Sequence, residues 1–469
     1  MEERRPAEGN TASNTRPGPR AGSGAPRSLE RVREVARGNK EARFTALLHH
    51  VDLDRLRAAY WAIRPQAAPG VDGVTWEAYG QDLQVRLQDL HARLHSGRYR
   101  ARPSRRSYIP KADGRQRPLG IATLEDKIVQ RAVVEVLNAV YEVDFLGFSY
   151  GFRPGRNPHQ ALDALSVGIW RKKVNWVLDA DIRDFFTNLD HDWLEKFLEH
   201  RIADQRVLRL IRKWLAAGVI EDGEWSQTEQ GAPQGASVSP LLANVYLHYV
   251  FDLWANWWRR HWAHGDVIIV RFADDFIVGF EYQEDAQRFL VELGERFAKF
   301  GLELHPDKTR LIEFGRFAAK NRQARGLGKP ETFDFLGFTH ICARMRDGRF
   351  WVRRITISKR MRAKLREVKD QLVRRRYQPV PEQARWLASV VRGHRAYYAV
   401  PGNRAAVATF RTQVTRLWHE ARERRSQRTR INWVRMNRLA TRWLPPARVV
   451  HPFPDVRFRV RTQGRSPVR

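Results

Sequence analysis

The stretch that decides the fold is VIIVRFADDFIVGF, residues 267–280. Two apolar runs flank Ala273, Asp274 and Asp275, and this pattern predicts a β-hairpin that carries both carboxylates. Two adjacent carboxylates in apolar surroundings are unfavourable, because each loses water and repels the other. A bound divalent cation would offset that cost. The alternative is a solvated turn, in which Asp is a common residue.

A third aspartate, Asp181, lies in NWVLDADIRDFFTNLDH, residues 175–191, where a strand predicted at 174–181 ends. If this strand neighbours the hairpin, three carboxylates come together. Carboxylate oxygens are the ligands that Mg²⁺ prefers. Two such ions activate a 3′-hydroxyl and stabilise the leaving pyrophosphate in nucleotidyl transfer. The sequence therefore favours a nucleic-acid polymerase.

The charge balance points to a polyanionic partner. The chain has 84 Lys and Arg against 52 Asp and Glu, a net charge of +32. Residues 371–469 contain 23 arginines, no lysine and four acidic residues. Arginine binds phosphate bidentately and stacks on bases, so RNA or DNA is the expected partner. A genome that favours arginine codons would explain part of the Arg bias but not the positive excess.

Other function classes are excluded by composition. The single cysteine, Cys342, allows no internal disulfide and no cysteine-paired zinc site. No apolar run approaches the ~20 residues needed to cross a bilayer. The first residues, MEERRPAEGN, do not resemble a secretion signal. We therefore expect a soluble protein in a reducing compartment, with no membrane partner.

The chain divides into segments of different pattern. Residues 1–44 are rich in Gly, Pro, Ser and Arg, and we expect them to be disordered. Strands and helices alternate from 45 to 350, including a long helix predicted at 241–262. Beyond 351 only helices are predicted, at 358–376, 381–400 and 403–425. A basic tail, 426–469, completes the chain.

Several blocks resemble one known family. FADD at 272–275 resembles the active-site box of group II intron reverse transcriptases, and DADIRDFF at 179–186 resembles the box with their first metal-binding aspartate. QGAPQGASVSPLLANVYL, residues 230–247, is nearly their consensus, and TFDFLGFTH, residues 332–340, matches their primer-grip hairpin. The resemblance spans residues 47–452 in the family's order. We identify the chain as resembling the bacterial intron-encoded enzymes.

The resemblance implies an α+β right-hand polymerase. Fingers and palm, with an antiparallel palm sheet, would occupy 45–350. An α-helical thumb or maturase domain would occupy 351–425, followed by the basic nucleic-acid-binding tail at 426–469. Asp181, Asp274 and Asp275 would bind two Mg²⁺ ions, for which Mn²⁺ can substitute. Asp179 and Asp184 would be neighbours rather than ligands.

The resemblance also implies a nucleotide site. Basic residues of SYIPKADGRQRPLGIATLEDKIVQRAV, 107–133, and just before it would hold the triphosphate. Phe186 would lie beneath the incoming sugar and exclude a 2′-hydroxyl, and the alternative is a core aromatic in a strand-to-helix turn. The small residues of 231–236 would let the backbone approach the nascent base pair. The expected nucleotide-site residues are Arg105, Lys111, Arg117, Phe186 and Gln234, with Lys308 as proton donor to pyrophosphate.

Contacts to the template and to intron RNA are expected elsewhere. SYGFRPGRNPHQAL, 149–162, and RWLASVVRGHRAYYAV, 385–400, match family blocks, and the basic region after 423 resembles the segment that follows them. A plain helical bundle with a solvated arginine face is the alternative, and Trp433 and Trp443 could pack on that bundle. The expected nucleic-acid-binding residues are Arg153, Arg156, Arg392, Tyr397, Tyr398, Arg424, Arg425, Arg428 and Arg430.

The expected function is RNA-directed DNA synthesis that copies intron RNA into cDNA and assists intron splicing and mobility. The partners would be intron RNA, an RNA template with its DNA primer, target DNA and dNTPs, in the bacterial cytoplasm and nucleoid. We expect the C-terminal endonuclease domain of many family members to be missing. Two alternatives stay open. One is a related enzyme in defence, a CRISPR-associated system or DNA repair, and the other is a splicing cofactor that binds RNA without polymerising.

Overall fold

A four-stranded antiparallel sheet forms the centre of the molecule. The computed structural model describes residues 25–110, 116–221, 224–226, 231, 235–425 and 431–462. The central sheet has the order β6-β7-β3-β8. The hairpin predicted at 267–280 is confirmed, and the predicted strand that ends at Asp181 lies beside it. The strands are β3 (Trp176–Asp181), β6 (Val267–Phe272), β7 (Asp275–Phe280) and β8 (Arg310–Glu313).

Helices cover both faces of the central sheet. Side chains alternate between the faces of a strand, and in β3 Leu178 packs into one hydrophobic core while Val177 packs into another. Helix α11 (Gln283–Lys299) contributes to the first core and α6 (Pro158–Arg171) to the second. The sheet is therefore buried on both sides, and only its ends and edges are accessible to a substrate.

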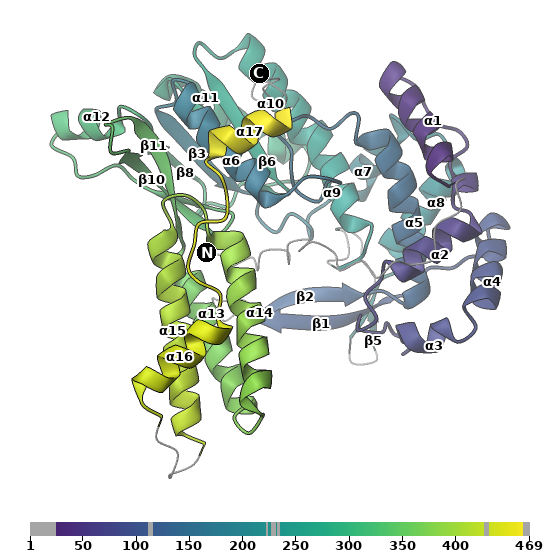
Figure 1. Ribbon diagram of the computed structural model, residues 1–469. Helices are drawn as coiled ribbons and strands as arrows, with labels where there is room; N and C mark the ends of the chain where they lie inside the picture. The colour runs from purple at the N-terminus through teal and green to yellow at the C-terminus, as the bar shows by residue number, and fades with distance from the viewer. Residues whose placement is uncertain are drawn as a thin grey trace.

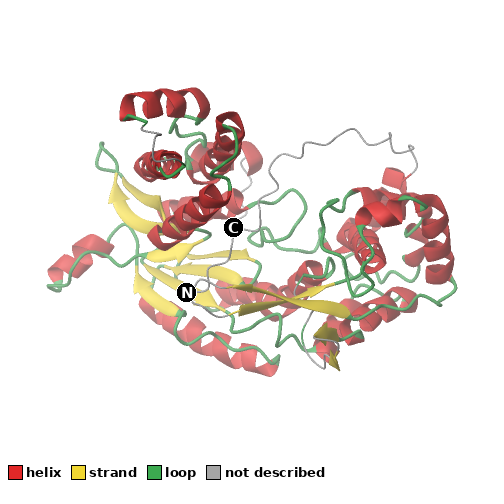
Figure 2. Cartoon of the chain, turned by 90° about the horizontal axis from the view of Figure 1, so that it is seen from below, coloured by secondary structure: helices red, strands yellow, loops and turns green. Residues whose placement is uncertain are grey.

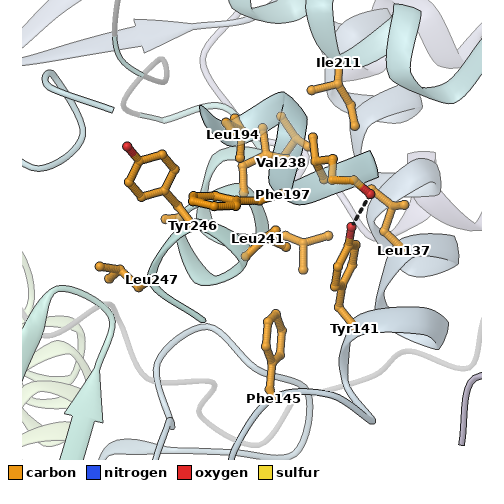
Figure 3. Packing of buried hydrophobic residues seen from close by; sticks show 14 of the residues in the cluster. Leu137, Tyr141, Phe145, Leu194, Phe197, Ile211, Val238, Leu241, Tyr246 and Leu247 are labelled. Atoms are coloured by element: carbon orange, nitrogen blue, oxygen red, sulfur yellow. Dashed lines mark hydrogen bonds between the residues drawn. The ribbon is translucent and has the colours of Figure 1, made fainter. Parts of the chain in front are cut away.

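The larger core extends from the sheet into a layer of helices. The helix predicted at 241–262 is confirmed as α9 (Ser239–Leu247) and α10 (Leu253–His261), joined by the π-helical segment His248–Asp252. Figure 3 shows part of this core, in which the Tyr141 hydroxyl donates a hydrogen bond to the Leu198 carbonyl at 3.1 Å. The other helices of this layer are α5 (Leu124–Tyr141), α7 (His191–Glu199) and α8 (Gln205–Ala216).

An N-terminal lobe carries a long hairpin. Strands β1 (Ser104–Pro110) and β2 (Gln116–Ile121) pair antiparallel, and β1 also pairs with β4 (Val219–Glu221) in a sheet of order β2-β1-β4-β5. The turn predicted at 112–114 lies outside the described residues. The remaining elements of the lobe are α1 (Ala25–Gly38), α2 (Leu53–Trp61), α3 (Trp76–Gly80), α4 (Leu83–His95) and β5 (Glu224–Ser226).

The expected disorder up to residue 44 is wrong for α1. Leu29, Val32 and Ala36 are buried along one face of this helix, and α1 packs against α5. Residues three and four apart lie on the same face of a helix. Arginine and glutamate between them obscured this apolar stripe in the sequence.

The C-terminal part is a helical bundle. Its predicted helices are confirmed as α13 (Ser358–Arg374), α14 (Val380–Tyr398) and α15 (Arg404–Glu423). The boundary predicted at 350 is wrong, because β11 (Phe350–Thr356) pairs with β10 (Phe338–Arg344), which pairs with β9 (Phe333–Phe335). Figure 2 shows the bundle and the N-terminal lobe as separate groups of helices. None of the helices described is long and apolar enough to cross a membrane.

The described part of the expected tail packs on the rest of the protein. Helix α16 (Trp433–Trp443) buries Met436 and Ala440 in the bundle core. The chain then runs back to the central sheet (Figure 1), where α17 (Pro454–Thr462) lies on α6. Phe458 is buried there, and Arg457 donates to Asp163 at 2.9 Å. A separate tail from 426 onward is therefore wrong for residues 431–462, and the packing alternative holds.

We expect Phe458→Ala to destabilise the protein, because it removes the buried anchor of α17. Truncation of a buried Phe costs about 3–5 kcal/mol, so the midpoint of thermal unfolding in calorimetry should fall clearly. The matched control is Val456→Ala in the same helix, since Val456 is exposed. Equal melting of both variants and the parent would show that α17 contributes nothing to stability.

Candidate active site

Three aspartates meet at one end of the central sheet. Asp181 ends β3 and lies directly opposite Asp275, the first residue of β7, in the antiparallel register. Asp274 precedes Asp275 in the turn that joins β6 to β7. Asp181 and Asp274 are only 8% and 7% exposed. The structure thus brings together the three carboxylates that the sequence singled out.

The turn that carries Asp274 is strained. Ala273 has a φ of 57°, in the left-handed region that non-glycine residues rarely adopt. Such a conformation persists only where the surrounding structure holds it. Gly151 packs directly against this turn, since a Cβ at Gly151 would lie 2.2 Å from the backbone nitrogen of Ala273. The position next to the turn therefore accepts only glycine.

Arg271 holds the strained turn from inside the protein. Its guanidinium is fully buried, and Nη1 donates to the carbonyl of Ala273 at 2.9 Å. Nε and Nη2 donate to the two carboxylate oxygens of Asp252 at 2.7 and 2.5 Å. Asp252 is itself fully buried and lies in the π-helical segment between α9 and α10. This bidentate ion pair fixes the guanidinium that supports the turn.

Two further residues complete the network around the guanidinium. Asn244 of α9 accepts from Arg271 Nη1 at 3.0 Å and donates to the carbonyl of Gly151 at 2.8 Å. Ser149 accepts from Arg271 Nη2 at 2.7 Å. Sequence reasoning missed this network. The only signal was an arginine inside an otherwise apolar strand, and its partners lie far away in the chain.

Lys308 lies beside the first aspartate. Its Nζ is 2.8 Å from Oδ2 of Asp181. The backbone N–H of His305 donates to the carbonyl of Asp181 at 2.8 Å, which ties the 301–310 segment to the end of β3. The ammonium therefore offsets the charge of a largely buried carboxylate.

The neighbouring aspartates have other surroundings. Asp179 lies 3.3 Å from Arg310, and burial raises the pKa of its carboxyl to about 6. Asp184 is exposed, with a φ of 43°. That Asp179 and Asp184 are neighbours of the metal ligands rather than ligands themselves stays a prediction.

The carboxylates suit a hard cation that also binds a substrate. Within the described residues, no three His, Cys, Asp or Glu side chains form a group that could hold a metal ion by themselves. Mg²⁺ seldom uses such a cage, and typically binds one or two protein carboxylates together with substrate phosphates and water. Two buried carboxylates beside a third, partly buried one fit this open mode of binding.

The expected nucleotide-site residues are described only in part. Phe186 is partly buried and contacts Phe185 edge to face at 5.3 Å. Gly231, with a φ of +90°, packs against the backbone of Phe186, since a Cβ at Gly231 would lie 2.7 Å from the Phe186 carbonyl oxygen. Arg105 donates to the carbonyl of Pro69 at 3.0 Å. The side chains of Lys111, Arg117 and Gln234 lie outside the part that the structure describes.

Some of the expected nucleic-acid contacts are structural instead. Arg153 is buried, lies 2.7 Å from Glu142, and donates to the carbonyls of Leu146 and Ser149. Its donors are used inside the protein, so the expectation that it contacts nucleic acid is wrong. Arg156 lies over the Tyr150 ring, and burial lowers the pKa of its guanidinium.

The two expected tyrosines also pack inside the protein. The Tyr397 hydroxyl donates to the Leu336 carbonyl at 2.7 Å, and Tyr398 is buried with its ring centroid 5.2 Å from that of Phe338. They join the bundle to strands β9 and β10, which corrects their expected contact with nucleic acid. Arg392, Arg424 and Arg425 are exposed, as nucleic-acid contacts require. Arg428 and Arg430 lie outside the described residues.

Comparison with known proteins agrees with this geometry. Residues 109–340 match the family described as reverse transcriptase (RNA-dependent DNA polymerase). The chain is 35% identical over 276 residues to protein YkfC of Escherichia coli K12, covering 52% of this chain and 72% of YkfC. It is 34% identical over 222 residues to the group II intron-encoded protein LtrA of Lactococcus lactis subsp. cremoris. The chain belongs to the group II intron reverse transcriptases.

The similarity to longer relatives of this reverse transcriptase is partial. The match to LtrA covers 47% of this chain and 37% of LtrA. A 91 kDa protein in the cob intron of Schizosaccharomyces pombe is 41% identical over 177 residues, which are 38% of this chain and 22% of that protein. The three aspartates lie inside the region that matches the reverse transcriptase family.

We expect Arg271→Lys to weaken metal use by this reverse transcriptase. Lysine keeps the charge but cannot pair with Asp252 bidentately while also reaching the Ala273 carbonyl. Changes in residues that orient metal ligands typically cost 10–100-fold in metal affinity or activity. The Mg²⁺ concentration for half-maximal primer extension should therefore rise by about 10-fold or more. A folded Arg271→Lys protein with an unchanged Mg²⁺ profile would contradict this role, and Arg260→Lys on the exposed side of α10 is the control.

Proposed function

We propose that this reverse transcriptase extends a DNA primer on an RNA template at the end of the central sheet. The observation that carries the proposal is that Asp181 of β3 lies opposite Asp275 of β7, with Asp274 in the adjoining turn. Two Mg²⁺ ions bound there, or Mn²⁺ in their place, would activate the 3′-hydroxyl and stabilise the leaving pyrophosphate. The central sheet then corresponds to the palm.

Lys308 is proposed to act on the pyrophosphate. Its position 2.8 Å from Asp181 supports this role, because it places a proton donor beside the proposed metal ligand. A proton donated as the P–O bond breaks neutralises the charge that develops on the leaving group. The same ammonium offsets the charge of Asp181 before substrate arrives.

The hairpin of β1 and β2 is proposed to hold the triphosphate. In Figure 1 it reaches from the N-terminal lobe toward the helical bundle. Arg117 belongs to its distal half, where it pairs with Ile109 through the backbone. Lys111, which directly follows β1 in the chain, is proposed to act with it. Arg105 lies at the base of the hairpin, where it pairs with Ile121. Gln234 is proposed to contact the incoming or templating nucleotide.

A second task is proposed from the relatives. LtrA is encoded by a group II intron, so we infer that this chain binds its parent intron RNA, assists its splicing and copies it into cDNA at a DNA target. The bundle would serve as thumb and maturase domain, with Arg392, Arg424 and Arg425 on its exposed surface. The high positive charge supports binding to RNA and DNA. This activity would place the protein with nucleic acid in the bacterial cytoplasm.

We expect Asp274→Ala and Asp181→Ala to abolish cDNA synthesis, because each removes a proposed metal ligand. RNA binding should persist, since the basic surfaces are unchanged. Primer extension on poly(rA)/oligo(dT), together with RNA binding, measures both properties. The matched control is Asp184→Asn, which removes an exposed negative charge three residues from Asp181, keeps a side chain that tolerates the left-handed φ of 43°, and should stay active. Near-normal synthesis by either ligand variant would refute the metal site.

We expect Phe186→Val to admit ribonucleotides. The smaller side chain would open space beneath the incoming ribose and so relieve the clash with its 2′-hydroxyl. The measurement is the ratio of rNTP to dNTP incorporation, and the control is Phe185→Leu, since Phe185 is buried in the core. An unchanged ratio in an active Phe186→Val enzyme would place this ring in the core alone.

A further inference from the structure

The N-terminal lobe contains a hollow lined by arginines. A cavity of about 420 Å³ lies between the end of α4, the segment that leads into β1, and the start of α5. These elements lie in the N-terminal lobe (Figure 1), and the hollow shares no residue with the carboxylate site. Its lining residues are Arg93, Arg98, Arg100, Ala101, Arg102, Pro103, Thr123, Glu125 and Asp126.

The backbone beneath these arginines is held firmly. Tyr99 is buried, and its hydroxyl donates to Asp126 and accepts from Trp214 Nε1 at 3.0 Å. Lys213 donates to the Tyr99 carbonyl at 2.5 Å. Because Tyr99 points inward, the side chains on either side of it point outward. The arginines are therefore presented from a fixed support rather than a mobile loop.

Three arginines form one row on this support. Arg98, Arg100 and Arg102 are exposed and alternate with the buried Tyr99 and the half-buried Ala101. The alternation of exposed and less exposed residues presents the three arginines on the solvent side of this segment. A strand of nucleic acid presents phosphates in a comparable row.

The acids in the hollow already have partners. Glu125 lies 3.0 Å from Arg93 and accepts from the Tyr79 hydroxyl at 3.4 Å. Asp126 accepts from Thr123 Oγ1 at 2.6 Å, and burial raises the pKa of its carboxyl.

The three arginines of the row have no such partner. Within the described part of the chain, no carboxylate forms an ion pair with Arg98, Arg100 or Arg102, and Arg98 only donates to Ser96 Oγ at 3.1 Å. The hollow therefore keeps an excess of positive charge from guanidinium groups that can each bind a phosphate bidentately.

We propose that the row Arg98, Arg100 and Arg102 is a binding site for the phosphodiester backbone of an RNA or DNA strand that runs outside the carboxylate site. The proposal rests on the proposed polymerase function, because a polymerase binds the nucleic-acid strand that would occupy this site. Pyrophosphate and dNTPs carry the same chemical group, so they are the competing source. The row favours a nucleic-acid strand over pyrophosphate or a dNTP, because successive phosphates of a strand can each bind one guanidinium group.

The test replaces the row with Arg98→Gln, Arg100→Gln and Arg102→Gln together. Binding of a mixed-sequence single-stranded RNA is measured by fluorescence anisotropy over a range of salt concentrations. Each lost phosphate contact lowers the slope of log affinity against log salt by about 0.7–0.9, so the slope should flatten by roughly 2–3 units. Titrations with pyrophosphate and with dATP provide the second arm.

The control variant loses the same charge from arginines that have carboxylate partners. It carries Arg57→Gln, Arg212→Gln and Arg349→Gln, whose partners are Asp54, Glu195 and Asp347. We expect it to keep the parent's salt slope. Thermal melting confirms that each variant is folded, and single substitutions replace the triple variant if that one melts early.

The outcomes separate the possibilities. An unchanged slope in the row variant would overturn the proposal, and so would an equal loss in the control, which would reveal a general effect of net charge. Loss of pyrophosphate or dATP binding without loss of RNA binding would also overturn it in favour of a free-phosphate site. Primer extension is assayed separately, so a parent protein that fails to polymerise would refute the proposed function and leave the salt slope interpretable.

Discussion

The geometry of the carboxylate site depends on the buried ion pair between Arg271 and Asp252. The turn that carries Asp274 needs a left-handed residue, and alanine adopts that conformation only where the surroundings hold it. The guanidinium provides this support by bonding to the Ala273 carbonyl. Breaking a buried ion pair leaves an uncompensated charge at a cost of about 3–5 kcal/mol, so the support is strongly maintained. The π-helical segment is part of the same constraint, because it carries Asp252.

A second buried ion cluster connects the C-terminal part to the central sheet. Asp163 of α6 accepts from Arg354 of β11 at 3.1 Å and from Arg457 of α17 at 2.9 Å. Helix α6 also packs on β6, the strand that leads into the strained turn. Strand β11 and helix α17 are thus both anchored to α6, the helix that packs behind the carboxylate site. The C-terminal part is therefore connected, through α6, to the strand that leads into the carboxylate site.

The arginines of this protein serve two physical purposes. Arg153, Arg271 and Arg354 are buried and satisfy backbone carbonyls or carboxylates, so they stabilise the fold. Arg98, Arg100 and Arg102 lie on a rigid support and have no carboxylate partner among the described residues. The net charge of +32 indicates a polyanionic partner, but individual arginines divide between these purposes according to burial. Burial depends on contacts that are distant in the chain.

The sequence by itself determined the central hairpin, the three aspartates and most helices, because alternation and helical periodicity are local patterns. It also indicated the family, since ordered motif blocks are read directly from residues. Only the tertiary structure decided that Asp181 faces Asp275, that Arg271 supports the turn, and that Tyr397 and Tyr398 pack against β9 and β10 rather than reach solvent. The same holds for α17, whose polar, arginine-rich sequence gave no sign that Phe458 docks on α6. These features arise from contacts between segments up to hundreds of residues apart, and periodicity within one segment carries no information about its distant partner.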